Sequence, residues 1–186
     1  SHARGKYISM CATDDVWLPN KLKGQVEQME CLSEDFGVLY SDAYMIDEEG
    51  NLLSEKFIEY HRKFSAVPQG EIFQQLLEDN WIPAMTTLIR KSVYGKVGYY
   101  DERLYYEDYD MWLRIAKRYQ FAYSHDLSAK YRAVATSLVR KLTQTEFIRS
   151  NILTFFKLLG KSGGGDKFIK RQVSRWVRGL YEQGER

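Results

Sequence analysis

Two carboxylates open a stretch whose spacing could support acid–base chemistry. Glu107 and Asp108 begin the sequence Glu-Asp-Tyr-Asp-Met-Trp-Leu-Arg. If a helix begins at Glu107, then Asp108, Trp112 and Ile115 share one face, because residues four and seven apart lie along the same side. The Asp108 carboxylate would then lie at the edge of an apolar wall, where it could accept a proton from a bound hydroxyl group. Asp108 could equally cap the helix by accepting hydrogen bonds from free N–H groups, and the local sequence leaves both roles open.

A second acidic pair, Asp14 and Asp15, follows a strand-like run at residues 6–12. In open α/β sheets, ligands bind beyond the carboxyl ends of the strands. Two adjacent carboxylates repel each other unless a cation or a hydrogen-bond donor lies between them. Oxygen ligands without a histidine partner favour Mg²⁺ or Mn²⁺ over Zn²⁺. The alternative is that one aspartate caps the helix opened by Pro19 while the other is solvated.

The two acidic pairs can act together only if the fold brings Asp15 and Asp108 to one cleft. In the first third of the chain, Leu22, Val26 and Met29 recur at helical spacing between two apolar extended runs. The order strand, helix, strand favours parallel pairing through a crossover helix. The predicted elements are a strand over 6–12, a helix over 19–32, a strand over 36–40 that continues extended over 42–46, and a turn over 47–51.

The middle of the chain is predicted to alternate short elements. Residues 52–68 lack a clean period, and we expect them to form a loop that could cover a site. The other predicted elements are a helix over 70–77, a strand over 84–89, a helix over 91–97 that Gly98 ends, the acidic helix over 107–119, and extended pieces over 121–123 and 129–132.

Two helices are predicted at the C-terminal end. The first covers residues 147–159, with an apolar stripe of Ile148, Ile152, Phe155, Phe156 and Leu159. The second covers residues 167–181, with an apolar stripe of Ile169, Val173, Trp176, Val177 and Leu180 and a basic remainder of Lys170, Arg171, Arg175 and Arg178. Such a helix could lie on an anionic membrane, but it more commonly packs its stripe on its own domain. Glycines 163–165 are predicted to be a flexible break, because no Lys-Ser/Thr ending follows them.

Length and composition fit one soluble α/β domain. The chain has 186 residues and a formal net charge of +2, so we expect no nucleic-acid partner. Cys11 and Cys31 are expected to be buried thiols in a reducing, cytoplasmic setting, with a single disulfide as the alternative. No apolar run reaches the length of a membrane-spanning helix, and no signal peptide is visible.

Four blocks of the sequence together resemble family 2 glycosyltransferases of the GT-A fold. Their order and spacing match that family over residues 3 to about 137, and the blocks are Arg4-Gly5-Lys6-Tyr7-Ile8, Ala12-Thr13-Asp14-Asp15-Val16-Trp17-Leu18-Pro19, Val38-Leu39-Tyr40-Ser41-Asp42 and Glu107-Asp108-Tyr109-Asp110-Met111-Trp112-Leu113-Arg114. The resemblance implies an α/β fold: a partial GT-A, nucleotide-diphospho-sugar transferase-like mixed sheet flanked by helices, with a C-terminal helical pair. We expect residues 1–2 to be an expression remnant, 3–143 the carboxyl-side part of the catalytic domain, and 144–186 a helical extension.

The resemblance also implies an activity and its site residues. An inverting transferase of this family moves a sugar from a nucleoside-diphosphate sugar to a saccharide or lipid-linked acceptor, here in cell-envelope or exopolysaccharide synthesis. The family's metal motif is usually Asp-x-Asp, and Ala12 stands in place of its first aspartate. The expected ligand of Mg²⁺ or Mn²⁺ is therefore Asp15, with Asp14 contacting the ribose or a metal-bound water. Glu107 and Asp108 match the family's Glu-Asp motif, in which Asp108 is the expected general base.

Acceptor-binding residues are expected on a third segment. By the same resemblance, Met85 and Thr86 lie on the strand that lines the acceptor side, and Trp81 precedes them. The Trp81 ring could stack on a sugar face. The alternative is that Trp81 packs beneath the neighbouring loop.

The chain departs from the family pattern at two places. Val134 stands where members often carry a histidine after the Tyr-Arg of the last strand region. The usual opening, a strand and turn that hold the nucleoside base, is missing. We therefore expect a truncated chain that has little or no transferase activity alone.

Two other classes of function remain open. A binding or assembly module could dock a membrane or a partner chain through the basic helix, and free sheet edges could favour a homodimer. A metal-dependent nucleotidyl or phosphoryl enzyme could use Asp14 and Asp15, but it would need a phosphate-cradling loop and none is seen. Neutral substitutions of Asp14 and Asp108 would separate these classes from the transferase.

Overall fold

The computed structural model describes residues 3–134, 142–160 and 165–182. These residues form two compact units, each described by itself. The first unit contains the chain up to Tyr99 together with Trp112–Val134, and the second contains Tyr100–Met111 with the C-terminal residues.

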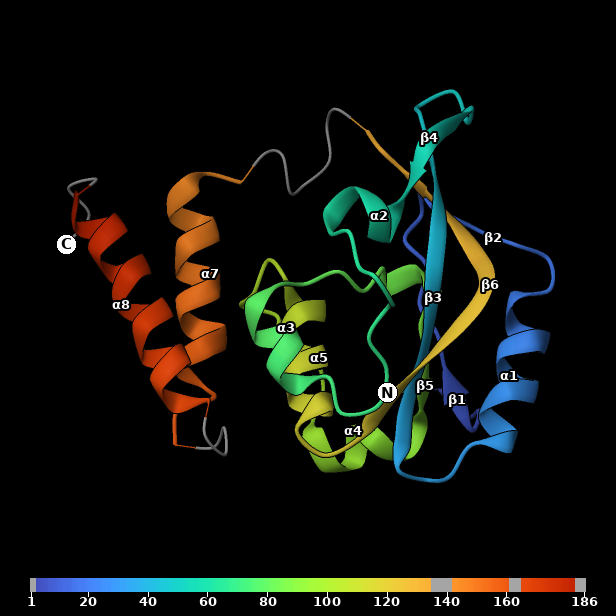
Figure 1. The fold of residues 1–186 in the computed structure, drawn as a ribbon, viewed down its shortest axis with the longest axis horizontal. Helices are drawn as coiled ribbons and strands as arrows, with labels where there is room; N and C mark the ends of the chain where they lie inside the picture. The colour runs from blue at the N-terminus through green and yellow to red at the C-terminus, as the bar shows by residue number, and fades with distance from the viewer. Residues whose placement is uncertain (1–2, 135–141, 161–164, 183–186) are drawn as a thin grey trace. The chain divides into compact units, whose positions relative to one another are not determined.

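The first unit is built on a six-stranded mixed sheet with the order β1-β5-β3-β6-β2, and β4 pairs with the long strand β3. Only β3 and β6 pair in parallel among the described strands, and every other pair is antiparallel. Figure 1 shows β3 and β6 as the two longest strands, side by side. The bounds are β1 Tyr7–Ile8, β2 Val16–Trp17, β3 Phe36–Ile46, β4 Leu52–Lys56, β5 Leu88–Arg90 and β6 Gln120–Arg132.

The predicted parallel pairing in the first third of the chain is wrong. The first strand covers only Tyr7–Ile8 rather than residues 6–12, and β5 lies between it and β3. Because β5 is antiparallel to both neighbours, β1 and β3 run in the same direction without hydrogen bonding to each other. The parallel partner of β3 is β6, which lies more than seventy residues further along the chain.

The strand predicted over 36–40 and continuing extended over 42–46 is confirmed as β3. The two extended pieces predicted at 121–123 and 129–132 are parts of one long strand, β6. The pairing of β3 with β6 shifts register between Ser41 and Ala43, where Ser124 and Ala129 are the successive partners. The extra residues of β6 bulge out of the ladder, and their polar side chains interrupt the apolar pattern from which the strands were predicted.

The predicted helices are present, but their bounds shift by up to three residues: the helix predicted over 19–32 covers Lys21–Cys31, the one over 70–77 covers Phe73–Glu78, and the one over 147–159 covers Gln144–Phe156. Other differences concern the kind of element or its end. Residues 52–68, expected to be a loop, contain β4 and the short helix α2, and the predicted strand over 84–89 begins with the 3₁₀-helix η1. The acidic helix ends at Ala116 rather than 119. The bounds are α1 Lys21–Cys31, α2 Phe57–His61, α3 Phe73–Glu78, η1 Ala84–Thr86, α4 Lys91–Val97, α5 Glu107–Ala116, α7 Gln144–Phe156 and α8 Asp166–Glu182.

The helix α4 confirms its prediction residue for residue, since it ends at Val97 and is followed by Gly98. Gly98 has φ +82°, in the left-handed region that glycine reaches without steric cost. The turn over 47–51 is also confirmed, because the Asn51 backbone N–H donates to Asp47 Oδ1 at 2.8 Å.

Apolar side chains cover both faces of the sheet. On one face Met29 of α1 packs with Leu39, Leu88 and Ala122, and α1 lies along this side of the strands in Figure 1. Of the predicted apolar positions on α1, Met29 is buried and Val26 packs partly buried against the core, whereas Leu22 is 45% exposed and Lys21 and Gln25 are buried beside Met29.

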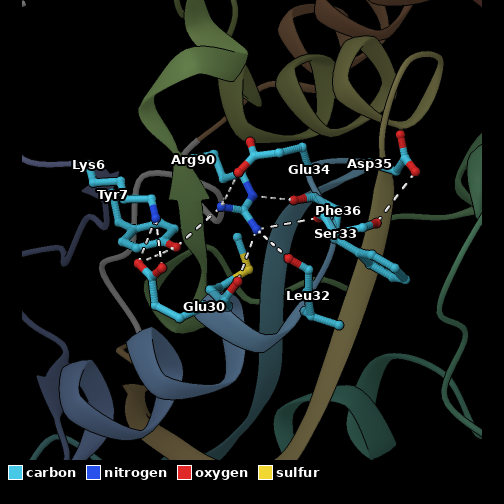
Figure 2. Close-up of polar contacts among 10 residues, drawn as sticks. Lys6, Tyr7, Glu30, Leu32, Ser33, Glu34, Asp35, Phe36 and Arg90 are labelled. Carbon is cyan, nitrogen blue, oxygen red and sulfur yellow. Dashed lines mark hydrogen bonds and ion pairs between the residues drawn. The ribbon is translucent and has the colours of Figure 1, made fainter.

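Arg90, at the end of β5, fixes the C-terminal end of α1 to the sheet (Figure 2). Its Nε donates to the Phe36 carbonyl at 2.9 Å, and its Nη2 donates to the carbonyls of Met29 at 2.9 Å and Leu32 at 3.0 Å. The last carbonyls of a helix lack hydrogen-bond donors within the helix, and the buried guanidinium of Arg90 provides donors for them. Glu34 adds an ion pair at 3.3 Å, and its carboxylate compensates part of the buried charge.

The second unit contains the packed helices α7 and α8. The ring of Phe155 on α7 lies 4.8 Å from the ring of Trp176 on α8, centroid to centroid. Thr143 and Glu146 form a capping box at the start of α7. Of the predicted stripe on α7, Phe155 is buried, whereas Phe156 is 63% exposed. Of the predicted glycine break, residues 163 and 164 lie outside the described residues.

The prediction of buried thiols is wrong. Cys11 and Cys31 are both exposed and free, because Cys31 lies at the last turn of α1 and Cys11 in the irregular segment after β1. Across the described residues, no helix is both long enough and apolar enough to cross a membrane.

Candidate active site

Asp14 and Asp15 lie in a turn between β1 and β2 of the first unit. The expectation that they directly follow a strand is wrong, because β1 already ends at Ile8. The Asp15 backbone N–H donates to the Ala12 carbonyl at 3.3 Å and closes the turn. Asp14 is exposed and Asp15 is half-buried, so one carboxylate of the pair is solvated and the other is largely removed from water.

The surroundings of Asp15 favour its protonated form. Burial and the neighbouring Asp14 charge raise the pKa of this carboxyl, while the Arg132 backbone N–H bond and the charge of Arg132 lower it, and the net pKa is about 6. A carboxyl group with a raised pKa loses its proton when a cation binds beside it, because the positive charge of the cation stabilises the negative carboxylate.

Arg132, the last residue of β6, holds the acidic turn in place. Its backbone N–H donates to Asp15 Oδ1 at 3.1 Å, and its Nε donates to the Asp14 carbonyl at 3.0 Å. Its Nη1 donates to the carbonyls of Asp47 and Glu48 in the β3–β4 turn, at 3.1 and 3.0 Å. Arg132 thus joins three segments that are distant in sequence. It was not among the predicted site residues, although the Tyr-Arg pair before Val134 marked its position.

The two aspartates suit a hard divalent cation. They offer carboxylate oxygens, which Mg²⁺ and Mn²⁺ prefer, and Mg²⁺ typically takes only one or two carboxylates while keeping water and phosphate oxygens. No group of three or more His, Cys, Asp or Glu side chains with metal-binding geometry occurs among the described residues. The donor set therefore fits a cation that shares its shell with a ligand's phosphates, rather than a metal held by protein alone.

A buried lysine connects the flanks of the acidic turn to the predicted acceptor segment. Lys21 Nζ donates to Ser9 Oγ at 2.8 Å, to Gln25 Oε1 at 2.7 Å and to the Thr87 carbonyl at 3.3 Å. Burial lowers the pKa of this ammonium to about 8. The Nζ also lies 4.8 Å from the ring centroid of Trp17. The hydrophobic pattern of the sequence did not predict the burial of Lys21, because lysine is rarely fully buried.

The structure places the predicted acceptor residues close to the acidic turn, but with little exposed surface. Trp17, two residues after Asp15, donates from Nε1 to the Met85 carbonyl at 2.9 Å. The Thr86 hydroxyl is fully buried and lies 2.8 Å from the carbonyls of both Ser41 and Pro83, and it can donate its one hydrogen to either. Contact of Met85 or Thr86 side chains with an acceptor would therefore require the covering residues to move.

Trp81 is fully buried and lies beneath residue 64 of the neighbouring segment. Its ring is 5.0 Å from the Phe64 ring, centroid to centroid, and its Nε1 donates to Tyr40 Oη at 3.3 Å. This geometry matches the packing alternative. Stacking of Trp81 on a sugar stays a prediction that requires displacement of Phe64.

Glu107 and Asp108 belong to the part of α5 that is grouped with the second unit. Trp112 and Ile115 are fully buried as predicted, while Asp108 is half-buried and Glu107 exposed. Asp108 Oδ1 accepts from the Tyr109 backbone N–H at 2.6 Å, so one oxygen serves the capping role. The two acidic pairs lie in different units, so the convergence of Asp15 with Asp108 stays a prediction.

Asp110, the second aspartate of the acidic helix, has a structural role. It is 1% exposed, and its Oδ1 forms an ion pair with Lys157 Nζ at 2.7 Å. Lys157 also pairs with Asp101 at 2.9 Å, and Asp101 pairs with Arg103 at 2.7 Å. These contacts hold the pKa of Asp101 far below its usual range. Within the second unit, the network ties the segment before α5 to the end of α7.

Comparison with known proteins places this arrangement in a family. The model of the family described as "Glycosyltransferase like family 2" matches residues 1–171. An uncharacterized glycosyltransferase of Methanocaldococcus jannaschii is 34% identical over 131 residues, which are 70% of this chain and 43% of that protein. The amylovoran biosynthesis glycosyltransferase AmsE of Erwinia amylovora is 30% identical, over 84% of this chain and 56% of its own length.

The name or title of two further matches includes a nucleotide sugar. The Escherichia coli protein WfgD, a UDP-Glc:alpha-D-GlcNAc-diphosphoundecaprenol beta-1,3-glucosyltransferase, is 26% identical over 62% of this chain and 40% of its own length. The crystal structure of S. aureus TarS 1-349 in complex with UDP-GlcNAc superimposes with a TM-score of 0.57 and 12% identity, over 97% of this chain and 50% of TarS. That likeness shows the GT-A fold.

The chain spans about half the length of the curated relatives it matches. The family model nevertheless covers most of the chain, including both acidic pairs and all six strands. The chain belongs to the glycosyltransferase-like family 2.

Proposed function

We propose that this chain is the carboxyl-side part of an inverting glycosyltransferase that moves a sugar from a nucleoside-diphosphate sugar to an acceptor hydroxyl. Family membership and the GT-A fold support this assignment. Two of the matched proteins carry UDP-sugars in their names or titles, which favours a UDP-sugar donor. Relatives in polysaccharide assembly favour a role in cell-envelope or exopolysaccharide synthesis.

The observation that carries the proposal is the state of Asp15. Its carboxyl is half-buried beside Asp14, has a pKa of about 6, and is held by the Arg132 backbone N–H. Asp15 would bind Mg²⁺ or Mn²⁺ directly, and Asp14 would contact the donor ribose or a metal-bound water. A divalent cation bound there would neutralise the diphosphate as it leaves.

Asp108 is the proposed general base, with Glu107 beside it in the first turn of α5. The carboxylate would take the proton of the acceptor hydroxyl as that oxygen attacks the sugar from the face opposite the diphosphate. Inversion through a transition state with oxocarbenium character would need only this one base, because a diphosphate neutralised by a cation would leave without being protonated. Trp112 and Ile115, four and seven residues further along the same helix, are fully buried.

The acceptor side is proposed to include Trp81, Met85 and Thr86. The bond from Trp17 to the Met85 carbonyl and the bond from Gln25 to the Thr86 carbonyl support the placement of Met85 and Thr86 near the acidic turn. Because Trp81 is buried beneath Phe64, stacking of Trp81 on a sugar would require the segment that carries Phe64 to move. The name of WfgD favours a lipid-linked saccharide as acceptor.

Binding and turnover test the proposal separately. This chain should bind Mn²⁺ together with UDP, and Asp15→Asn should weaken that binding at least tenfold. In a full-length version, Asp15→Asn and Asp108→Asn should each reduce sugar transfer at least a hundredfold with folding intact. We expect this chain alone to have little or no transferase activity. Transfer by the chain alone at the full-length rate would refute that last expectation, and undiminished transfer by both variants would refute the proposed site.

A further inference from the structure

The helix α8 carries a concentrated positive charge that the proposed transfer chemistry does not use. It contains five cations and two carboxylates, and the carboxylates, Asp166 and Glu182, are its first and last residues. Residues 167–181 therefore carry a charge of +5 without a single acid, whereas the whole chain carries only +2. The net charge of the protein conceals this local excess.

Most of the apolar stripe of α8 is already covered within the second unit. Ile169 is fully buried, and Trp176 packs its ring edge-to-face against Phe155 of α7. Gly179 also lies against α7, because a Cβ atom there would be 3.7 Å from Ile148 Cδ1. The covered part of the stripe is therefore not available to enter a membrane, whereas Val177, another member of the stripe, is 50% exposed at the border of the basic face.

The five cations share one exposed face. At 100° per residue they spread over an arc of about 140°, all five side chains are exposed, and they are Lys167, Lys170, Arg171, Arg175 and Arg178. Among the described residues, none of the five forms an ion pair with a carboxylate. Five like charges held on one helix face repel one another, and no carboxylate in the described part of the chain offsets this repulsion. An anionic partner would offset it.

Two apolar side chains border the basic arc. Val177 is 50% exposed and Tyr181 is 75% exposed, and the two are one helical turn apart beside Lys170. Cations with long aliphatic stems next to an exposed tyrosine and valine are suited to a surface that is charged outside and apolar just beneath. Nucleic acid offers the charge without the apolar layer, so this border favours lipid.

We propose that the exposed face of α8 docks on the surface of an anionic lipid bilayer, with the helix parallel to the membrane plane and α7 behind it. The cations contact lipid headgroups, and Val177 and Tyr181 enter the interfacial layer. Each cation near such a surface contributes about 1 kcal/mol, which is about fivefold in partitioning. The docking depends on α8 alone. Only the expectation that the enzyme finds a lipid-linked acceptor at this membrane rests on the proposed function.

Sedimentation with vesicles tests the proposal directly. The chain should bind vesicles of phosphatidylcholine mixed with phosphatidylglycerol, should bind pure phosphatidylcholine at least a hundredfold more weakly, and should be released by 0.5 M salt. The triple variant Lys170→Glu, Arg171→Glu and Arg178→Glu should lose about a hundredfold in partitioning. A control variant with the same charge change, Lys23→Glu, Lys91→Glu and Lys96→Glu, replaces three exposed lysines of the first unit and should stay within threefold of the unmodified chain.

The outcomes separate docking from folding and from the proposed function. The triple variant should keep the melting temperature and the Mn²⁺–UDP binding of the unmodified chain, because none of its three positions is buried. Equal binding of anionic vesicles by the triple variant, or equal loss in the control variant, would overturn the proposal. Tighter binding of duplex DNA than of anionic vesicles, with the same dependence on Lys170, Arg171 and Arg178, would also overturn it. Failure of the chain to bind Mn²⁺–UDP would count against the transferase site and leave the docking result standing.

Discussion

The backbone N–H of Arg132 donates to Asp15 Oδ1 at 3.1 Å, so the acidic turn is fixed to the end of β6. The same residue holds the Asp14 carbonyl through Nε and the β3–β4 turn through Nη1. The two aspartates do not adjoin the strand β1, and they are held instead by β6, which pairs with β2 immediately after Asp15. Their placement depends on a residue more than a hundred positions away in the sequence.

Replacement of Arg132 should weaken metal binding through the position of the turn. Arg132→Ala removes the side-chain bonds to Asp14, Asp47 and Glu48 but keeps the backbone bond to Asp15. We expect Mn²⁺ affinity in the presence of UDP to fall about tenfold, as for residues that orient metal ligands. Arg132→Lys keeps the positive charge but loses the planar guanidinium with its several N–H donors, so it should restore little of the Mn²⁺ affinity. Calorimetric titration measures both, and unchanged affinity in Arg132→Ala would contradict the positioning role.

Asp15 should make stability depend on pH in the metal-free protein. Its pKa is about 6 in the folded chain and about 4 when unfolded. Between these values the folded state binds more protons, so stability falls as pH rises from about 4 to about 6 and then stays level. The Asp15→Asn variant does not show this loss of stability, because an asparagine side chain does not ionise. At pH 7 the variant should be the more stable by about 1 kcal/mol, after allowance for partial exposure to solvent.

Urea unfolding at pH 4 and pH 7 without metal measures this difference. The Asp15→Asn advantage should appear at pH 7 and vanish at pH 4, and addition of Mn²⁺ and UDP should reverse it by stabilising only the unmodified chain. Asp14→Asn provides the matched control, because Asp14 is exposed. A variant that is less stable than the unmodified chain at pH 7 would show that the Asp15 carboxylate is well compensated without a cation.

Lys21 should give a pH dependence in the alkaline range. Burial lowers the pKa of its ammonium to about 8 in the folded chain, against about 10.4 when unfolded. Between these values the unfolded state binds more protons, so the contribution of Lys21 to stability rises as pH increases from about 8 to 10.4. Relative to Lys21→Met, the unmodified chain should gain up to about 3 kcal/mol across this window. A constant difference from pH 7 to 10.5 would contradict the lowered pKa.

Asp110 should behave as a structural residue of the acidic helix. Asp110→Asn removes the buried ion pair with Lys157, which keeps its contact with Asp101. We expect a loss of about 2 kcal/mol in unfolding free energy, less than for a buried charge left without any partner. Glu107→Gln, an acid-to-amide change at an exposed position of the same helix, should change stability by less than about 0.5 kcal/mol. Equal effects of the two variants on the melting temperature would argue against the network.

Local rules predicted much of the fold. The helix α4 and its end at Gly98 follow from apolar spacing and one glycine, and they needed no tertiary information. The strand β6 was split in the prediction because polar residues such as His125 and Asp126 interrupt its apolar pattern, and in the structure they bulge out of the ladder between the pairs Ser41–Ser124 and Ala43–Ala129. The position of β5 between β1 and β3 also depends on tertiary contacts that periodicity does not encode.

Candidate site residues could be proposed to the extent that they resemble a family motif. Asp14 and Asp15 were proposed in this way, and Arg132 was not, because its contacts are one backbone N–H bond and bonds to three carbonyls far apart in the sequence. Lys21 was missed for a different reason. Spacing placed Leu22 on the buried face of α1, whereas the hydrogen bonds of Lys21 and Gln25 to η1 and its neighbour rotate the polar side inward.

The central claim is that Asp15 holds a divalent cation for the diphosphate of a nucleotide. Electron paramagnetic resonance of Mn²⁺ tests it directly, because the signal of free aqueous Mn²⁺ decreases as the ion binds. With this chain and UDP, the free Mn²⁺ signal should fall as protein is added, and it should remain unchanged with Asp15→Asn under the same conditions. A signal that falls equally for both proteins, or for neither, would contradict the account.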